Sequence, residues 1–222
     1  MNIKYLKPNN IKIISRILLD RLFGLDFLKT VLSEDVGLNP EKVHRSSPSG
    51  NVYLKELLKD FKIDTQDSII DIGCGKGSAM RTMIQFPFQK VDGIELSDVI
   101  AKIAERNFSI LKVKKATIFV GDAAEFKSYE DYNMIYFYNP FPNSVMTDVV
   151  KALIASLEVK KRELIIIYNN PICHDIIVNN NVFKKIGTYP DIWGNGIGIY
   201  SNYDLSHSRL LKNKKILLDP SN

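Results

Sequence analysis

The part of the chain that most restricts its fold is a glycine-rich segment, DIGCGKG, at residues 71–77. It follows the apolar run at residues 68–70 and precedes residues that can form a helix. Glycine at three alternate positions, Gly73, Gly75 and Gly77, indicates a loop whose backbone turns tightly or lies against a ligand. A glycine loop between a strand and a helix directs backbone N–H groups at such a ligand. The segment therefore predicts the ligand-binding end of an α/β unit.

Short β-type runs alternate with helical patterns from residue 68 onward, which is typical of parallel βαβ units. We predict strands at 68–72, 90–95, 116–120, 133–138 and 163–168, and helices near 77–86, 98–108, 143–157 and 172–179. Two further β-type runs, at 181–189 and 195–202, are joined by a turn-rich segment and predict a hairpin that closes the sheet. The expected fold is α/β and Rossmann-like, with a mostly parallel seven-stranded sheet whose last strand is antiparallel.

The N-terminal part has a different pattern, with apolar residues at helical spacing in residues 13–28 and 51–61. We therefore predict a helical appendage or lid at residues 1–67, before a sheet domain at 68–202. Residues 203–222 are predicted to be a C-terminal tail, either a last helix or a frayed end. A chain of 222 residues with 45% hydrophobic content is long enough for one sizeable core.

Composition and charge restrict the class of protein. The sequence has no apolar run of membrane-spanning length and no signal-peptide pattern, so we expect a cytoplasmic protein without a membrane partner. Its two cysteines, Cys74 and Cys173, fit neither a disulfide framework nor a metal site, so no metal is expected. The net charge of +5 is spread over short runs that are typical of solvated faces, so nucleic acid is not the favoured partner.

The glycine spacing argues against two other ligands. In the dinucleotide fingerprint the third glycine stands at position six, but here that position, counted from Gly73, is Ser78. A nicotinamide-dependent oxidoreductase is therefore disfavoured, although it shares the βαβ start. The nucleotide-triphosphate loop requires Gly-Lys followed by Ser or Thr, whereas Lys76 stands between two glycines.

The stretch DIGCGKG resembles the first motif of class I S-adenosylmethionine-dependent methyltransferases, in which an acidic residue, here Asp71, precedes Gly-x-Gly-x-Gly. Three further elements follow in the family's order at predicted strand ends: VDGIELSD, VGDAAEF and YFYNPFP. The resemblance covers roughly residues 68–200. It implies that the cofactor is S-adenosyl-L-methionine and the product S-adenosyl-L-homocysteine.

The resemblance also implies a role for individual residues. Glu95 would accept hydrogen bonds from the two ribose hydroxyls, and Asp122 would contact the adenine amino group. For both carboxylates the structural alternative is a helix N-cap or a solvated loop end. Lys76 and Arg81 are expected to be solvated at the start of a helix. The full set of expected cofactor-binding residues is Asp71, Gly73, Gly75, Gly77, Glu95, Leu96, Asp122, Ala123 and Asn139.

The element YNPFP resembles the Asn-Pro-Pro-Tyr element of amino-methylating enzymes, in which the Asn side chain and a neighbouring carbonyl accept hydrogen bonds from the target NH₂. The expected catalytic residues are Asn139, Pro140 and Phe141. Phe141 replaces the second proline and Pro142 replaces the aromatic residue, which argues against a flipped adenine as acceptor. We predict an amino nitrogen of a protein or small molecule as the acceptor, and an oxygen acceptor stays open as the alternative. The alternative for Asn139 is a rigid turn that ends the strand.

Two functional readings are thus compared. The leading one is an S-adenosylmethionine-dependent methyltransferase, with His44, Ser47 and Tyr53 as candidate lid residues. The alternative is a catalytically silent binding module of the same fold that docks RNA or protein. The complete set of glycines and carboxylates argues against that alternative.

Overall fold

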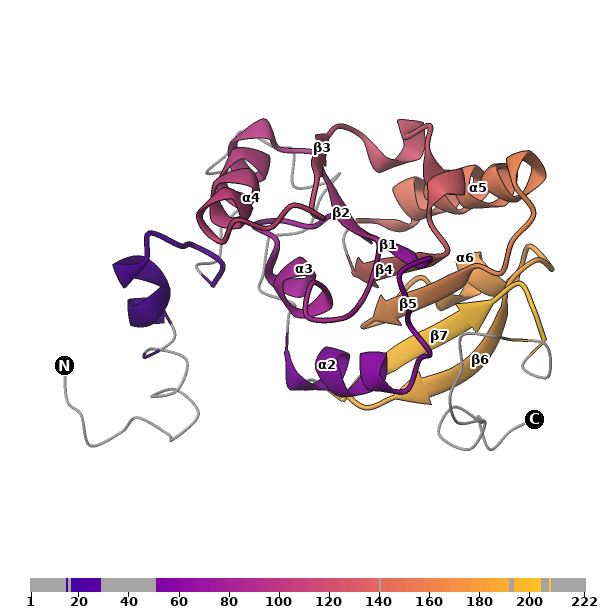
Figure 1. Cartoon of the computed structure of the whole chain (residues 1–222). Helices are drawn as coiled ribbons and strands as arrows, with labels where there is room; N and C mark the ends of the chain where they lie inside the picture. Colours follow the sequence, from indigo (N-terminus) through magenta and orange to yellow (C-terminus); the bar gives the residue numbers. More distant parts are fainter. Residues whose placement is uncertain are drawn as a thin grey trace.

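The computed structural model describes residue 15 and residues 17–28, 51–139, 141–191, 194–204 and 208. The described part contains a seven-stranded sheet with the strand order β3-β2-β1-β4-β5-β7-β6 (Figure 1). Strands β1 to β5 pair in parallel, whereas β7 runs antiparallel to both of its neighbours, β5 and β6. The predicted fold class, with its antiparallel last strand, is confirmed.

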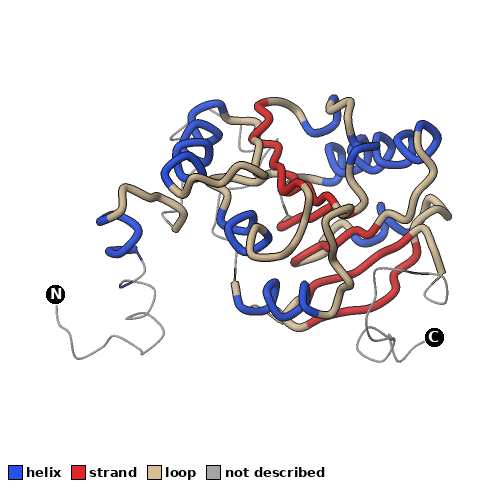
Figure 2. Tube along the Cα trace, viewed as in Figure 1, coloured by secondary structure: helices blue, strands red, loops and turns tan. Residues whose placement is uncertain are grey.

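The elements alternate along the chain as the sequence predicts. In chain order they are α2 (Val52–Lys59), β1 (Ser68–Ile72), α3 (Ser78–Met83), β2 (Lys90–Glu95), α4 (Asp98–Ile110), β3 (Ile118–Val120), η3 (Ala123–Glu125), η4 (Tyr129–Asp131), β4 (Met134–Tyr138), α5 (Asn143–Val159), β5 (Ile165–Asn169), α6 (His174–Val178), β6 (Lys184–Tyr189) and β7 (Ile197–Ser201). Figure 2 shows the strands gathered into one sheet with helices on both sides.

The core has two layers because each strand turns alternate side chains to opposite faces of the sheet. Ile69 of β1 packs with residues of α2, α3 and α4, whereas Ile70 and Ile72 pack with residues of α5 and α6. All five residues of β1 are buried. Both faces of the sheet are therefore covered, as expected for parallel strands with a continuous apolar sequence.

Several elements begin or end one to three residues away from their predicted bounds. Strand β3 begins at Ile118 and not at residue 116, and the N–H of Thr117 is bonded to the side chain of Asp92 at 2.9 Å. Strand β5 begins at Ile165, and the N–H of Leu164 donates to Asn202 Oδ1 at 2.8 Å. In both places a side-chain oxygen accepts the backbone N–H that would otherwise donate to the neighbouring strand.

The described N-terminal residues contain helix, as predicted. Residues 17–22 are helical, and α2 begins after Asn51, whose side chain accepts the N–H of Leu54 at 3.1 Å as an N-cap. Leu57 and Leu58 of α2 lie in the same core as the sheet. The division of the chain at residues 67 and 202 stays a prediction. The candidates His44 and Ser47, Pro140 and most of the C-terminal tail lie outside the described residues.

Candidate active site

The glycine loop connects β1 to α3 and bends back over the end of β2. The N–H groups of Gly73 and Cys74 both donate to the carbonyl of Ile94, at 2.9 and 3.0 Å. Gly73, Gly75 and Gly77 all have positive φ, at 76°, 54° and 83°, so the loop follows a left-handed path that side chains rarely adopt. The three glycines of the sequence are thus explained by the loop's own conformation.

Glu95, the last residue of β2, holds this loop in place. Its Oε2 accepts the N–H of Gly75 at 2.9 Å, and its Oε1 accepts the N–H of Ser97 at 3.0 Å. Burial raises the pKa of Glu95, and the N–H groups of Ser97 and Gly75 oppose that rise because they favour the charged form. Each carboxylate oxygen has a second lone pair that can accept a ligand hydroxyl. The structure therefore adds a loop-holding role to the ribose contact, which stays a prediction.

Asp71, next to last in β1, carries an unsatisfied carboxylate. Its side chain is buried, and among the described residues its Oδ2 has no hydrogen-bond partner. Burial, together with the nearby charge of Glu95, raises the pKa of Asp71 from 3.8 to about 8. A buried acceptor without a donor is rare in native proteins and points to a ligand or an ordered water. The arrangement suits a cationic or hydrogen-bond-donating group.

Asp122 and Ala123 follow β3, beside the end of β2. The N–H of Gly121 donates to the carbonyl of Glu95 at 3.0 Å, which brings the two strand ends together. Asp122 is exposed, and its Oδ1 accepts the N–H of Ala124 at 2.8 Å, so it is the N-cap of η3. The structural alternative named for Asp122 is thus observed. Its contact with adenine stays a prediction, as does that of the buried Ala123.

The element after β4 begins with Asn139, whose φ of 42° lies in the left-handed region. Asn is one of the few residues that tolerate this conformation. The hydroxyl of Tyr168 lies 3.5 Å from Asn139 Oδ1, at the limit of a hydrogen bond. Phe141 is buried in the core on the α5 side. Its ring packs edge-on against that of Phe137, with 6.2 Å between the ring centroids. The catalytic roles of Asn139, Pro140 and Phe141 stay predictions.

These elements lie together because β3, β2, β1 and β4 are neighbours in the sheet, in that order. Asp122, Glu95, Asp71 with the glycine loop, and Asn139 therefore lie at or beside the C-terminal ends of four adjacent strands. In open α/β sheets that edge is where ligands bind.

Within the described residues no cluster of His, Cys, Asp or Glu is suited to hold a metal ion. Nor does any described helix have the length and hydropathy of a membrane span.

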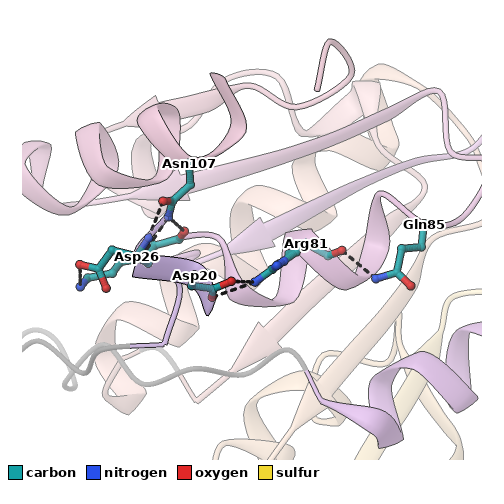
Figure 3. A network of polar contacts seen from close by, with 6 residues as sticks. Asp20, Asp26, Arg81, Gln85 and Asn107 are labelled. Carbon is teal, nitrogen blue, oxygen red and sulfur yellow. Dashed lines mark hydrogen bonds and ion pairs between the residues drawn. The ribbon is translucent and has the colours of Figure 1, made fainter. Parts of the chain in front are cut away.

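The prediction that Lys76 is solvated is wrong, whereas the Arg81 side chain is 32% exposed and also forms an ion pair. Lys76 is buried, and its Nζ lies 2.6 Å from Asp26 Oδ2. Arg81 Nη1 donates to both carboxylate oxygens of Asp20, at 2.8 and 2.9 Å (Figure 3). Both partners come from the N-terminal segment, more than 45 positions away, so nothing in the local sequence could indicate them.

Sequence reasoning also missed Asn169, the last residue of β5, which lies one residue beyond the strand predicted at 163–168. Asn169 is fully buried, and among the described residues neither amide atom has a hydrogen-bond partner. It pairs in register with Tyr138 of β4, immediately before Asn139. The only sequence signal is an Asn at the end of an apolar strand, which a turn explains equally well.

The fold and the order of the four elements define a Rossmann-like α/β domain whose candidate site lies at the β3-β2-β1-β4 edge. Residues 69–160 match the family model described as a methyltransferase domain. A curated relative from Methanococcus maripaludis, described as a probable cobalt-precorrin-6B C(15)-methyltransferase (decarboxylating), is 24% identical over 158 residues. The alignment covers 69% of this chain and 80% of the relative.

Solved structures share the fold at low sequence identity. The ribosomal protein L11 methylase of Lactobacillus delbrueckii subsp. bulgaricus is 15% identical, with a TM-score of 0.51 over 67% of this chain and 75% of that one. The S-adenosylmethionine-bound amino pentose methyltransferase CalS10 of Micromonospora echinaspora is 11% identical, with a TM-score of 0.50 over 68% and 87%. At these identities the structural matches show a common fold.

Residues 69–160 thus match a methyltransferase domain, and the predicted resemblance to class I S-adenosylmethionine-dependent methyltransferases is confirmed. The predicted cofactor, S-adenosylmethionine, agrees with these matches.

Proposed function

We propose that this protein transfers the methyl group of S-adenosylmethionine to an amino nitrogen of a protein or a small molecule. The observation that supports this most directly is the position of Asn139 immediately after β4, beside the strand that carries Asp71 and the glycine loop. Its amide oxygen can accept a hydrogen bond from an acceptor NH₂.

The residues at the sheet edge fit the cofactor's chemistry. S-adenosylmethionine is cationic and, when bound, supplies an electrophilic methyl group. Asp71 Oδ2 is the buried acceptor that lacks a donor among the described residues, and Glu95 retains lone pairs beyond its two backbone bonds. In this proposal Asp71 binds a donor or cationic group of the cofactor, Glu95 the ribose, and Asp122 the adenine.

Asn139 would orient the acceptor nitrogen, and proximity and alignment would supply most of the rate. No acid or base is required from the protein if the amine reaches the site in its neutral form. Carbon methylation through a cysteine nucleophile is disfavoured, because Cys173 is buried and its Sγ lies 3.0 Å from Asn143 Oδ1. Burial also raises the pKa of Cys74, and the thiolate is the reactive form.

A carbon acceptor is nevertheless the second candidate, because the curated relative is described as acting on carbon 15 of a precorrin. The two candidates differ in product chemistry. Transfer of labelled methyl groups to amines and to tetrapyrrole precursors, followed by identification of the methylated atom, distinguishes them. A catalytically silent binding module would bind partners without consuming the cofactor.

The first test is calorimetric titration of the full chain with S-adenosylhomocysteine. Binding supports the methyltransferase proposal, and no heat at millimolar concentration would refute it. The second test compares Asn139→Ala with Asn181→Ala, because Asn181 is also left-handed (φ 62°) but exposed and follows α6. Asn139→Ala should lower turnover about a hundredfold and lower the affinity for S-adenosylhomocysteine much less. Equal losses in turnover and affinity would make Asn139 a structural turn.

A further inference from the structure

The N-terminal segment at residues 17–28 is attached beside the glycine loop by polar contacts. Lys76 of the loop pairs with Asp26, and Arg81 of α3 pairs with Asp20. Arg106 of α4 also donates to the carbonyl of Gly24. Figure 3 shows Asp20 facing Arg81, and Asn107 directed at Asp26. Three of the segment's residues are thus bonded to the loop, to α3 and to α4.

Asn107 of α4 bonds to the segment and to the loop at once. Its Oδ1 accepts the N–H of Asp26 at 2.8 Å, and its Nδ2 donates to the carbonyls of Asp26 and Lys76, both at 3.1 Å. The side chain is fully buried. One amide therefore fixes the backbone of the loop at Lys76 relative to the backbone of the segment at Asp26.

The ion pair of Lys76 depends on the segment in the same way. Lys76 lies between Gly75, whose N–H is bonded to Glu95, and Gly77. Its side chain is only 3% exposed, and a buried ammonium group needs a charged partner to offset its lost hydration. Without the carboxylate of Asp26, the buried ammonium of Lys76 loses the partner that offsets its lost hydration, which disfavours the loop conformation that buries it.

Apolar contacts hold only one end of the segment. Phe27 is buried, and its ring centroid lies 5.7 Å from that of Phe108. The Cζ atom of Arg81 lies over the Phe27 ring, 4.7 Å from its centroid. At the other end, the exposed fractions of four apolar side chains exceed one half: Leu18, Leu19, Leu22 and Phe23. The segment is therefore attached by apolar contacts of Leu25 and Phe27 and by its polar contacts near the loop.

We propose that Asp26 and Asn107 are positioning residues for the cofactor: they hold the glycine loop in its binding conformation by attaching residues 17–28 to it. This inference rests on the proposed use of S-adenosylmethionine. Attachment of the segment and binding of the cofactor are then coupled, and such coupling is reciprocal. Loosening the segment weakens cofactor binding, and bound cofactor holds the segment more firmly.

The first experiment is calorimetric titration of the full chain with S-adenosylhomocysteine. Asp26→Asn and Asn107→Ala should each weaken binding about tenfold, within the usual range of coupling between sites. Asp26→Glu, which keeps the carboxylate, should restore part of the affinity. The matched control is Asp148→Asn, which breaks the exposed pair with Lys151 on α5 and should change nothing.

The second readout is tryptic cleavage at the exposed Arg21 inside the segment. S-adenosylhomocysteine should slow this cleavage several-fold in the unmodified chain, and less in Asp26→Asn. Circular dichroism melting confirms that each variant is folded. Binding to the unmodified chain with unchanged affinity in both folded variants, or cleavage that does not respond to ligand, would overturn the inference. Absence of binding to the unmodified chain would instead refute the cofactor assignment.

Discussion

Gly77 faces the ring of Phe108 so closely that a Cβ atom at position 77 would lie 2.5 Å from Phe108 Cε2. The last glycine of the loop is therefore required twice, by its φ of 83° and by this contact between the loop and α4. Phe108 in turn packs on Phe27. The glycine loop, α4 and the N-terminal segment are thus packed against one another.

Gly77→Ala should destabilise the fold by about 2–4 kcal/mol, which combines left-handed strain with overpacking against Phe108. Urea denaturation measures the change. Gly194→Ala is the control for strain alone, because Gly194 has a φ of 89° and nothing lies within 4 Å of the added Cβ. Equal losses of stability in the two variants would show that the Phe108 ring moves aside without lowering the free energy of unfolding.

Glu95→Ala should weaken binding of S-adenosylhomocysteine by about 1.5–3 kcal/mol, the range for a lost charge-assisted hydrogen bond. It should also lower stability, because the N–H groups of Gly75 and Ser97 lose their acceptor. Calorimetry and thermal melting separate the two effects. Glu125→Ala, at an exposed position in η3, is the control. Unchanged affinity would restrict Glu95 to its role in the loop.

The stability of the ligand-free protein should decrease as pH rises from about 4 to about 8. The pKa of Asp71 is 3.8 in an ordinary setting and about 8 when buried beside Glu95. Between these values the folded protein keeps a proton that the unfolded chain has lost, so raising the pH favours unfolding. Urea midpoints at about pH 5 and about pH 8 measure this decrease, and Asp71→Asn should reduce it. The same slope in Asp71→Asn would assign the proton to another group.

The affinity for S-adenosylhomocysteine should change in the opposite direction, if its ammonium group pairs with ionised Asp71. Because deprotonation of a carboxyl with a pKa of about 8 would have to accompany binding, affinity should rise with pH by up to about tenfold per unit below pH 8. Calorimetric titrations at several pH values test this. A flat profile would show that Asp71 binds its ligand group in the protonated form.

Asn169→Leu should raise the free energy of unfolding by about 1–3 kcal/mol, because it replaces an unsatisfied buried amide with an apolar side chain of similar size. Affinity for S-adenosylhomocysteine should not change, since β5 is separated from β1 by β4. Asn107→Leu is the control: it is equally buried but makes three hydrogen bonds, and its replacement should destabilise. A destabilised Asn169→Leu would show that its amide is satisfied after all.

The amino-acid sequence by itself determined the order of the strands and helices along the chain and the edge of the sheet at which the candidate site lies. Gly73, Gly75 and Gly77 indicate a tight local backbone conformation. The alternation of β-type runs with helical patterns indicates a parallel sheet. Because parallel strands end at one edge, Asp71, Glu95 and Asn139 could be placed together without any knowledge of packing.

Tertiary structure alone decided what holds that site. Asp26 and Lys76 are 50 positions apart, and Asn107 and Asp26 are 81 apart, yet they share one network of hydrogen bonds. Such contacts depend on how segments distant in the chain dock, and neither spacing nor periodicity encodes docking. The residues next to Lys76 in the sequence do not indicate whether its side chain is solvated or buried. The unsatisfied amide of Asn169 is likewise visible only in the structure. Whether a buried amide finds a hydrogen-bond partner depends on all the residues that surround it in the fold.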